Sequence, residues 1–199
     1  MLAERARALE RRMDAMEALN EVGSLVGAKR FDEALQLLDR KDAAIAREPR
    51  LLRLRALALL GLRRFDEADE AAAQIPGSSG TDMQEFVAQY PALAFRQRLA
   101  VALGMLREGK RGEADGILRT AVAPDDKGAG ELAYCRAFAS ALEGFELKRK
   151  GEHDASRKCF LAGMSGIAPY LGGSASGDRA HIAELFDRME KEADSYVRR

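Results

Sequence analysis

The string RFDEA occurs twice in this chain of 199 residues, at positions 30–34 and again at 64–68, an offset of 34 residues. Repetition at a fixed period of roughly 20–50 residues is the sequence signature of repeat architectures. Two weaker copies follow at residues 109–114 and 151–156, where a glycine and charged residues lead to a small residue. The sequence therefore predicts a tandem array of about four similar units.

Apolar residues recur with helical spacing before and after each copy. Leu51, Leu54, Ala58 and Leu62, for example, share one helical face ahead of the second copy. The chain has 36 Ala and 25 Leu but only 6 Val, 5 Ile and 2 Thr, too few β-branched residues for several strands. The sequence predicts an all-α fold in which each unit is a helix, a tight turn and a second helix.

Each residue type in the motif has a physical role at the start of the second helix. The aromatic, Phe31 or Phe65, is expected to wedge against the first helix of its unit. The Asp-Glu pair places negative charge in the first turn, where the helix dipole favours it. The small residue, such as Ala34, lets two helix backbones approach closely. Neighbouring hairpins must then stack to bury their remaining apolar faces.

These residues resemble the tetratricopeptide repeat (TPR) family, whose unit is about 34 residues of two antiparallel helices. The resemblance covers roughly residues 13–169 and implies a right-handed α-α superhelix. It assigns Phe31 and Phe65 to the turn aromatic, Ala34, Ala68 and Ala114 to the small residue, Gly144 to the small residue of the first helix, and Gly109 and Gly151 to the turn glycine. The chain departs from the family pattern in having no Trp, Ala28 at the expected first turn glycine, and Arg111 and His153 in place of the aromatic.

We expect a single domain over residues 1–199, with hairpins at 15–76, 91–124 and 129–169. Pro91 is expected to start the first helix of the third unit, after a short separate helix around 83–90. Residues 178–199 form an amphipathic pattern that predicts a C-terminal capping helix. Residues 1–14 are expected to form a helical extension. Its stripe of Leu2, Ala6, Leu9, Met13 and Met16 fits either a cap or a coiled-coil contact.

Charge and hydropathy exclude several classes of protein. The 32 basic residues balance 32 acidic ones, so general nucleic-acid binding is disfavoured. No apolar run approaches the ~18 residues of a membrane span, and the charged N-terminus does not fit a signal peptide. Without an export signal, Cys135 and Cys159 are expected to be reduced thiols in a cytoplasmic protein.

One local charge asymmetry stands out, with Arg47, Arg50, Arg53, Arg55, Arg63 and Arg64 opposed only by Glu48. The TPR resemblance implies that the first helix of each unit lines a concave groove. On that basis the expected groove residues are Arg50, Arg53, Leu57, Arg96, Leu99 and Leu103. Such a surface suits an acidic or amphipathic peptide. A merely solvated arginine face remains the alternative.

No motif indicates catalysis or cofactor binding. His153, His181 and the two cysteines lack metal-ligand spacing, and the glycine-rich segment 172–177 lacks the Lys-Ser/Thr of a P-loop. Carboxylate pairs such as Asp66/Glu67 belong to helix starts. We expect no catalytic residue, no metal and no cofactor.

The favoured function is a non-enzymatic protein-interaction module or adaptor. One version is a chaperone resembling the repeat-containing chaperones of bacterial secretion systems. A self-assembling structural protein is a second hypothesis, and an enzyme with a site between helices is a third.

Overall fold

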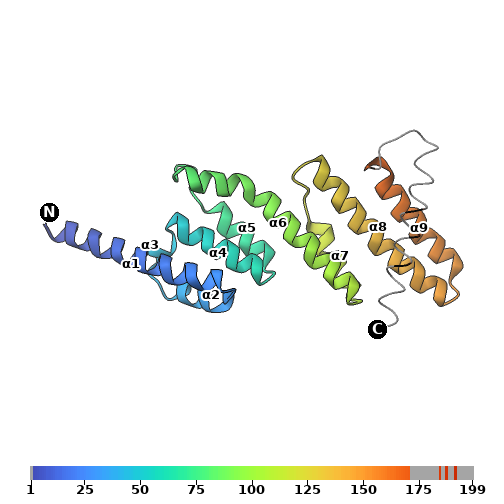
Figure 1. Cartoon of the computed structure of the whole chain (residues 1–199), viewed down its shortest axis with the longest axis horizontal. Helices are drawn as coiled ribbons and strands as arrows, with labels where there is room; N and C mark the ends of the chain where they lie inside the picture. Colours follow the sequence, from blue (N-terminus) through green and yellow to red (C-terminus); the bar gives the residue numbers. More distant parts are fainter. Residues whose placement is uncertain (1, 171–183, 185–186, 188–190, 192–199) are drawn as a thin grey trace. The chain divides into compact units, whose positions relative to one another are not determined.

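The structure, a computed structural model, describes residues 2–170 together with 184, 187 and 191 (Figure 1). That part of the chain is built from helices and contains no strand, which confirms the all-α prediction. The helices are α1 (Leu2–Gly27), α2 (Phe31–Asp39), α3 (Ala43–Ala46), α4 (Pro49–Gly61), α5 (Phe65–Ala73), α6 (Thr81–Arg107), α7 (Arg111–Thr120), α8 (Asp126–Arg149), α9 (His153–Ile167) and the 3-10 helix η1 (Ala168–Tyr170).

The chain divides into two compact units, residues 1–94 and 95–199. In the first unit α1 packs on α2, α4 packs on α5, and α2 and α1 both contact α4. In the second unit α8 packs on both α7 and α9. Its apolar core joins the end of α6 to these helices around the fully buried Phe138.

All four copies of the motif follow the same three-residue turn. Its central residue has a left-handed φ, 59° at Lys29, 63° at Arg63, 76° at Gly109 and 80° at Gly151. In the first turn the amide of Lys29 donates to the carbonyl of Val26 at 3.0 Å, and that of Arg30 to the carbonyl of Leu25 at 2.9 Å. The other three turns repeat this pair of bonds, which is the Schellman arrangement that ends a helix.

The turn position differs by one residue from the sequence-based expectation. The left-handed residue lies five positions before the small residue in every copy, so its place in the first copy is Lys29 and not Ala28. Gly109 and Gly151 occupy this position in the last two copies.

The small residue of the motif is buried in each hairpin. Ala34, Ala68 and Ala114 are completely buried. The fourth copy has Ser156 there, also buried, and its hydroxyl donates to the carbonyl of Gly144 in α8 at 2.8 Å. The serine therefore fits at the close approach of α9 to α8 without leaving its hydroxyl unsatisfied.

The motif aromatic of the first hairpin reaches beyond its own hairpin. The ring of Phe31 lies against Gly61 at the end of α4, which belongs to the next hairpin. In the fourth copy, where His153 replaces the aromatic, Phe160 of α9 packs on Gly144 and on the ring of Phe145, with ring centroids 4.8 Å apart.

The Arg and the Glu of RFDEA form an ion pair at the helix start. The Nε of Arg30 donates to Oε1 of Glu33 at 2.6 Å, and Arg64 repeats this bond with Glu67 at 2.7 Å. The hydrogen bond from arginine holds the pKa of both Glu33 and Glu67 below the usual range. The motif thus ties the residue preceding the second helix to its first turn.

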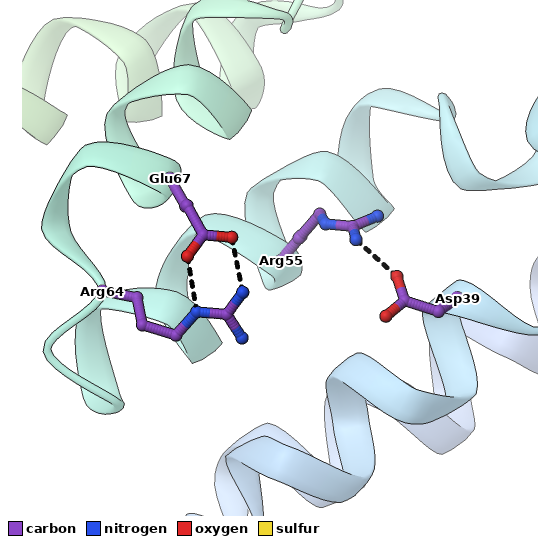
Figure 2. A network of polar contacts seen from close by, with 4 residues as sticks. All are labelled: Asp39, Arg55, Arg64 and Glu67. Carbon is purple, nitrogen blue, oxygen red and sulfur yellow. Dashed lines mark hydrogen bonds and ion pairs between the residues drawn. The ribbon is translucent and has the colours of Figure 1, made fainter.

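Figure 2 shows the Arg64–Glu67 ion pair close to a second ion pair, between Arg55 and Asp39, which connects two hairpins. Arg55 of α4 donates to Asp39 at the end of α2, while Arg64 and Glu67 face each other at the start of α5. The Arg55–Asp39 ion pair joins the second hairpin to the first, alongside the Phe31–Gly61 contact.

Local capping sets the starts of α3 and α4. The second helix of the first copy ends at Asp39, and Asp42 then starts the single-turn α3 by accepting from the amide of Ala44 at 2.9 Å. Pro49 occupies the first turn of α4.

The prediction that a new helix starts at Pro91 is wrong, because α6 continues through that residue. Proline removes a helix hydrogen bond, at a cost of ~3 kcal/mol. Buried residues at helical spacing continue across it, namely Met83, Phe86, Tyr90 and Ala94. This continuous apolar face explains why the helix persists.

The predicted capping helix, residues 178–199, lies outside the described residues except for Glu184, Asp187 and Lys191, which are helical and exposed. The glycine-rich segment 172–177 also lies outside them.

Candidate functional site

The predicted groove residues of the first unit lie on α4, and two of them, Arg50 and Arg53, contact the beginning of α6. The guanidinium carbon of Arg53 lies 5.1 Å from the ring centroid of Phe86, which is a cation-π arrangement. Arg50 forms an ion pair with Asp82 across 3.9 Å, and both side chains are more than half exposed. Arg53 is therefore engaged inside the unit, whereas Arg50 is held only weakly. Leu57 is half-buried.

The other predicted groove residues, Arg96, Leu99 and Leu103, belong to α6 in the second unit. Arg96 is exposed, but Leu99 is buried in the apolar core and Leu103 packs against that core. The two leucines thus contribute mainly to the stability of their own unit. The six predicted residues are consequently divided between two units.

A pocket of about 410 Å³ lies in the first unit between α1, α3 and the start of α4. Its lining combines guanidinium groups with an apolar floor and includes Arg11, Arg12, Met16, Leu19, Ile45 and Arg50. Arg50 is the only predicted groove residue among them. We call this site the α1/α4 pocket.

The pocket forms because α1 is much longer than α2 and because α3 and α4 start close beside it. Helix α1 has 26 residues and its partner α2 has 9, so α1 extends well beyond the hairpin. The single turn of α3 then brings Ile45 beneath α1, and Ile45 is buried there. Pro49 begins α4 directly afterwards and places Arg50 at the rim.

The electrostatic balance of the α1/α4 pocket is positive. Three arginines line it, and Glu48 is the acidic residue among the lining side chains. The Glu48 carboxylate caps α4 by accepting from the amide of Arg50 at 3.0 Å. This carboxylate is already hydrogen-bonded at a helix N-terminus. It therefore competes poorly with an incoming anion for the guanidinium groups.

An exposed apolar stripe on α1 adjoins the pocket. Leu9, Met13 and Met16, called the α1 stripe below, keep 61%, 71% and 55% of their surface exposed. Met16 belongs to both the stripe and the pocket lining. Contiguous exposed apolar side chains beside polar groups are typical of protein interaction surfaces, and Met adapts readily to different partners.

Sequence reasoning missed Arg11 and Arg12 as site residues. They were placed in an N-terminal extension and were not connected to Arg50, which lies nearly forty positions later. The available signal was a pair of adjacent arginines within a helical pattern longer than a single helix of the repeat unit.

The cysteines and histidines show no activated nucleophile among the residues that the structure describes. Burial raises the pKa of the Cys135 thiol to about 11, and burial is also the main cause of the raised pKa of Cys159. A reactive cysteine needs a lowered pKa, so both free thiols are poorly nucleophilic. His153 is exposed at the start of α9, and His181 lies outside the described residues.

Two acidic side chains of α5 have structural partners. Glu67 pairs with Arg64, and Asp69 accepts a hydrogen bond from the hydroxyl of Tyr90 at 2.9 Å. Within the described part of the chain, no three His, Cys, Asp or Glu side chains are grouped to hold a metal ion. None of the helices described is both long enough and apolar enough to cross a membrane.

Comparison with family models, with curated proteins and with solved structures finds no match to this chain. The geometry of the α1/α4 pocket and of the surface around it is therefore the available evidence for function.

Proposed function

We propose that this protein is a non-enzymatic protein-interaction module whose α1/α4 pocket binds an acidic, amphipathic segment of a partner protein. The observation that supports this most directly is the grouping of Arg11, Arg12 and Arg50 around an apolar floor. Glu48, the acidic side chain beside them, is already bound to a helix N-terminus. The role is that of an adaptor or a chaperone for a client protein.

The chemistry of the pocket matches an amphipathic helix better than a small metabolite. An apolar side chain of the partner would fill the floor formed by Met16, Leu19 and Ile45, as in other helix-in-groove interactions. Carboxylates on the flanks of the same helix would accept charge-assisted hydrogen bonds from the arginines.

The scaffold we propose is a TPR-like right-handed superhelix of stacked hairpins. The support is the recurrence of one turn geometry at Lys29, Arg63, Gly109 and Gly151, together with the buried small residue that follows each turn. Equivalent turns give each hairpin the same internal geometry, and stacking of similar hairpins is how solenoids form.

Binding is tested with a fluorescein-labelled peptide that has one leucine face and one glutamate face. Fluorescence anisotropy should show saturable binding of this peptide to the full chain, and the affinity should fall as salt is raised. A matched peptide with lysine in place of glutamate should bind at least about ten-fold more weakly. Equal affinity for the two peptides would contradict the proposed charge recognition.

The location of the site is tested by charge reversal. The double variant Arg11→Glu/Arg50→Glu should weaken binding of the acidic peptide by about ten-fold or more. Arg149→Glu/Arg157→Glu is the matched control, because it makes the same charge change at exposed positions of the second unit. An equal loss of affinity in both double variants would show a general electrostatic effect and exclude the pocket as the site.

A further inference from the structure

The outer face of α1 has the pattern of a coiled-coil seam. Ala18 and Val22 are completely buried on the face that packs into the first unit, while the α1 stripe of Leu9, Met13 and Met16 faces solvent. The stripe has spacings of four and three residues, which is the a/d spacing of a heptad. In the sequence Leu2 and Ala6 continue this spacing before the stripe, and Asn20 continues it afterwards.

Charged residues flank the seam in a fixed order. With Met13 at position a and Leu9 and Met16 at position d, Arg5 and Arg12 occupy position g, whereas Glu10 and Glu17 occupy position e. These four charged side chains are all exposed. Positions e and g border the seam, and their charges set which helix pairs with which and in what direction.

The order of the charges selects one arrangement. In a parallel pair of identical helices, position g of one helix faces position e of the following heptad in the other. Arg5 would face Glu10 of the second copy, and Arg12 would face Glu17 of the second copy. In an antiparallel pair g faces g and e faces e, so arginines would meet arginines and glutamates would meet glutamates.

We infer that the N-terminal half of α1 pairs with the same segment of a second copy of this chain as a parallel, two-stranded coiled coil. Leucine at position d and a single asparagine at position a, here Asn20, are both features of parallel dimers. Gly23 and Gly27 take the next d and a positions, so the apolar seam ends after Asn20.

This pairing goes beyond the proposed function and does not depend on it. Leu9, Met13, Arg5 and Glu10 do not line the α1/α4 pocket, so variants at these positions leave that pocket unchanged. The seam is only two to three heptads long, so the dimer should be weak and its population should depend on protein concentration.

Sedimentation equilibrium of the full chain tests the inference. The apparent mass should rise with concentration from 21.8 kDa towards twice that value. Met13→Glu should keep the chain monomeric over the same range, with unchanged helicity because Met13 is exposed. Leu161→Glu is the matched control, since Leu161 is an exposed leucine of the second unit and its variant should still dimerise. A constant monomer mass for the unaltered chain, or a dimer that survives Met13→Glu, would overturn the inference.

A charge-swap experiment tests the orientation. Arg5→Glu and Glu10→Arg should each weaken self-association by about ten-fold, because each places like charges at two g–e contacts. An equimolar mixture of the two variants should form a heterodimer about as tight as the original dimer. In that heterodimer the introduced glutamate of one chain faces the introduced arginine of the other, so both g–e contacts again join opposite charges. Stronger self-association of Arg5→Glu, or no recovery in the mixture, would contradict the parallel arrangement.

Discussion

The ring of Phe31 in α2 lies directly on Gly61 in α4, so the motif aromatic of the first hairpin packs on the next hairpin. A Cβ added to Gly61 would lie 2.6 Å from Cζ of Phe31, well inside the ~3.5–4.0 Å of an ordinary carbon contact. The absence of a side chain at residue 61 is therefore what allows α2 and α4 to approach each other.

The substitution Gly61→Ala should destabilise the first unit. Overpacking against the Phe31 ring costs about 1–3 kcal/mol, which exceeds the gain of up to ~1 kcal/mol from the better helix propensity of alanine. A lower urea midpoint, measured by circular dichroism, is the expected result. Adding Phe31→Leu to this variant should recover part of the loss.

Gly104→Ala provides the control for that measurement. Gly104 lies inside α6 with no atom within 4 Å of an added Cβ, so alanine should raise stability by up to ~1 kcal/mol. Equal midpoints for Gly61→Ala and Gly104→Ala would contradict the packing role of Gly61.

Substitution at the four left-handed turn positions should change stability in opposite directions for the two glycines and the two non-glycine residues. Gly109→Ala and Gly151→Ala should each cost about 1 kcal/mol, because a Cβ disfavours their positive φ although the space around them is open. Lys29→Gly and Arg63→Gly relieve the same strain and should be neutral or stabilising by up to ~1 kcal/mol. Scanning calorimetry measures all four; a neutral Gly109→Ala would show that the turn is not strained.

The all-helical fold was predictable from the sequence because its determinants are local. The RFDEA motif, the helical periodicity and the small residue at positions such as Ala34 all act within one or two helical turns. The turn position was misplaced by one residue because Lys29 and Arg63 occupy it, and neither residue type signals a left-handed conformation. Pro91 was misread because its local preference was overridden by the apolar face of α6.

The surroundings of Arg50 were less predictable because they depend on contacts distant in sequence. Arg50 was identified from its charge cluster, but nothing local indicates that Arg53 stacks on Phe86, more than thirty positions later. Likewise, the proximity of Arg11 to Arg50 follows from the packing of α1 on α4, which a single sequence does not reveal.

The contact between Arg53 and Phe86 should contribute measurably to stability. A double-mutant cycle with Arg53→Gln and Phe86→Leu should give a coupling free energy of about 0.5–1 kcal/mol, as expected for a partly exposed cation-π pair. Thermal unfolding of the four chains provides the measurement. Strictly additive effects would show that the two side chains do not interact, and Arg53 would then be available to a ligand.

The buried Cys135 should make stability depend on pH in the alkaline range. Its pKa is raised from an ordinary 9.0 to about 11, so the folded chain holds the thiol proton where the unfolded chain releases it. This contribution is complete below pH 9 and is lost as pH rises from 9 to about 11.

Comparison with Cys135→Ala isolates this effect from the titration of other groups. The melting temperature of the unaltered chain should fall more steeply between about pH 9 and 10.5 than that of the variant. Parallel curves would contradict a raised pKa at Cys135.

The most direct test of the central claim is to map where an acidic amphipathic peptide binds by NMR. Titration of the ¹⁵N-labelled chain should shift amide signals of residues 11–19 in α1, of α3 and of the first turn of α4, while those of α8 and α9 stay unchanged. Shifts concentrated in the second unit, or no shifts at saturating peptide, would contradict a binding site in the α1/α4 pocket.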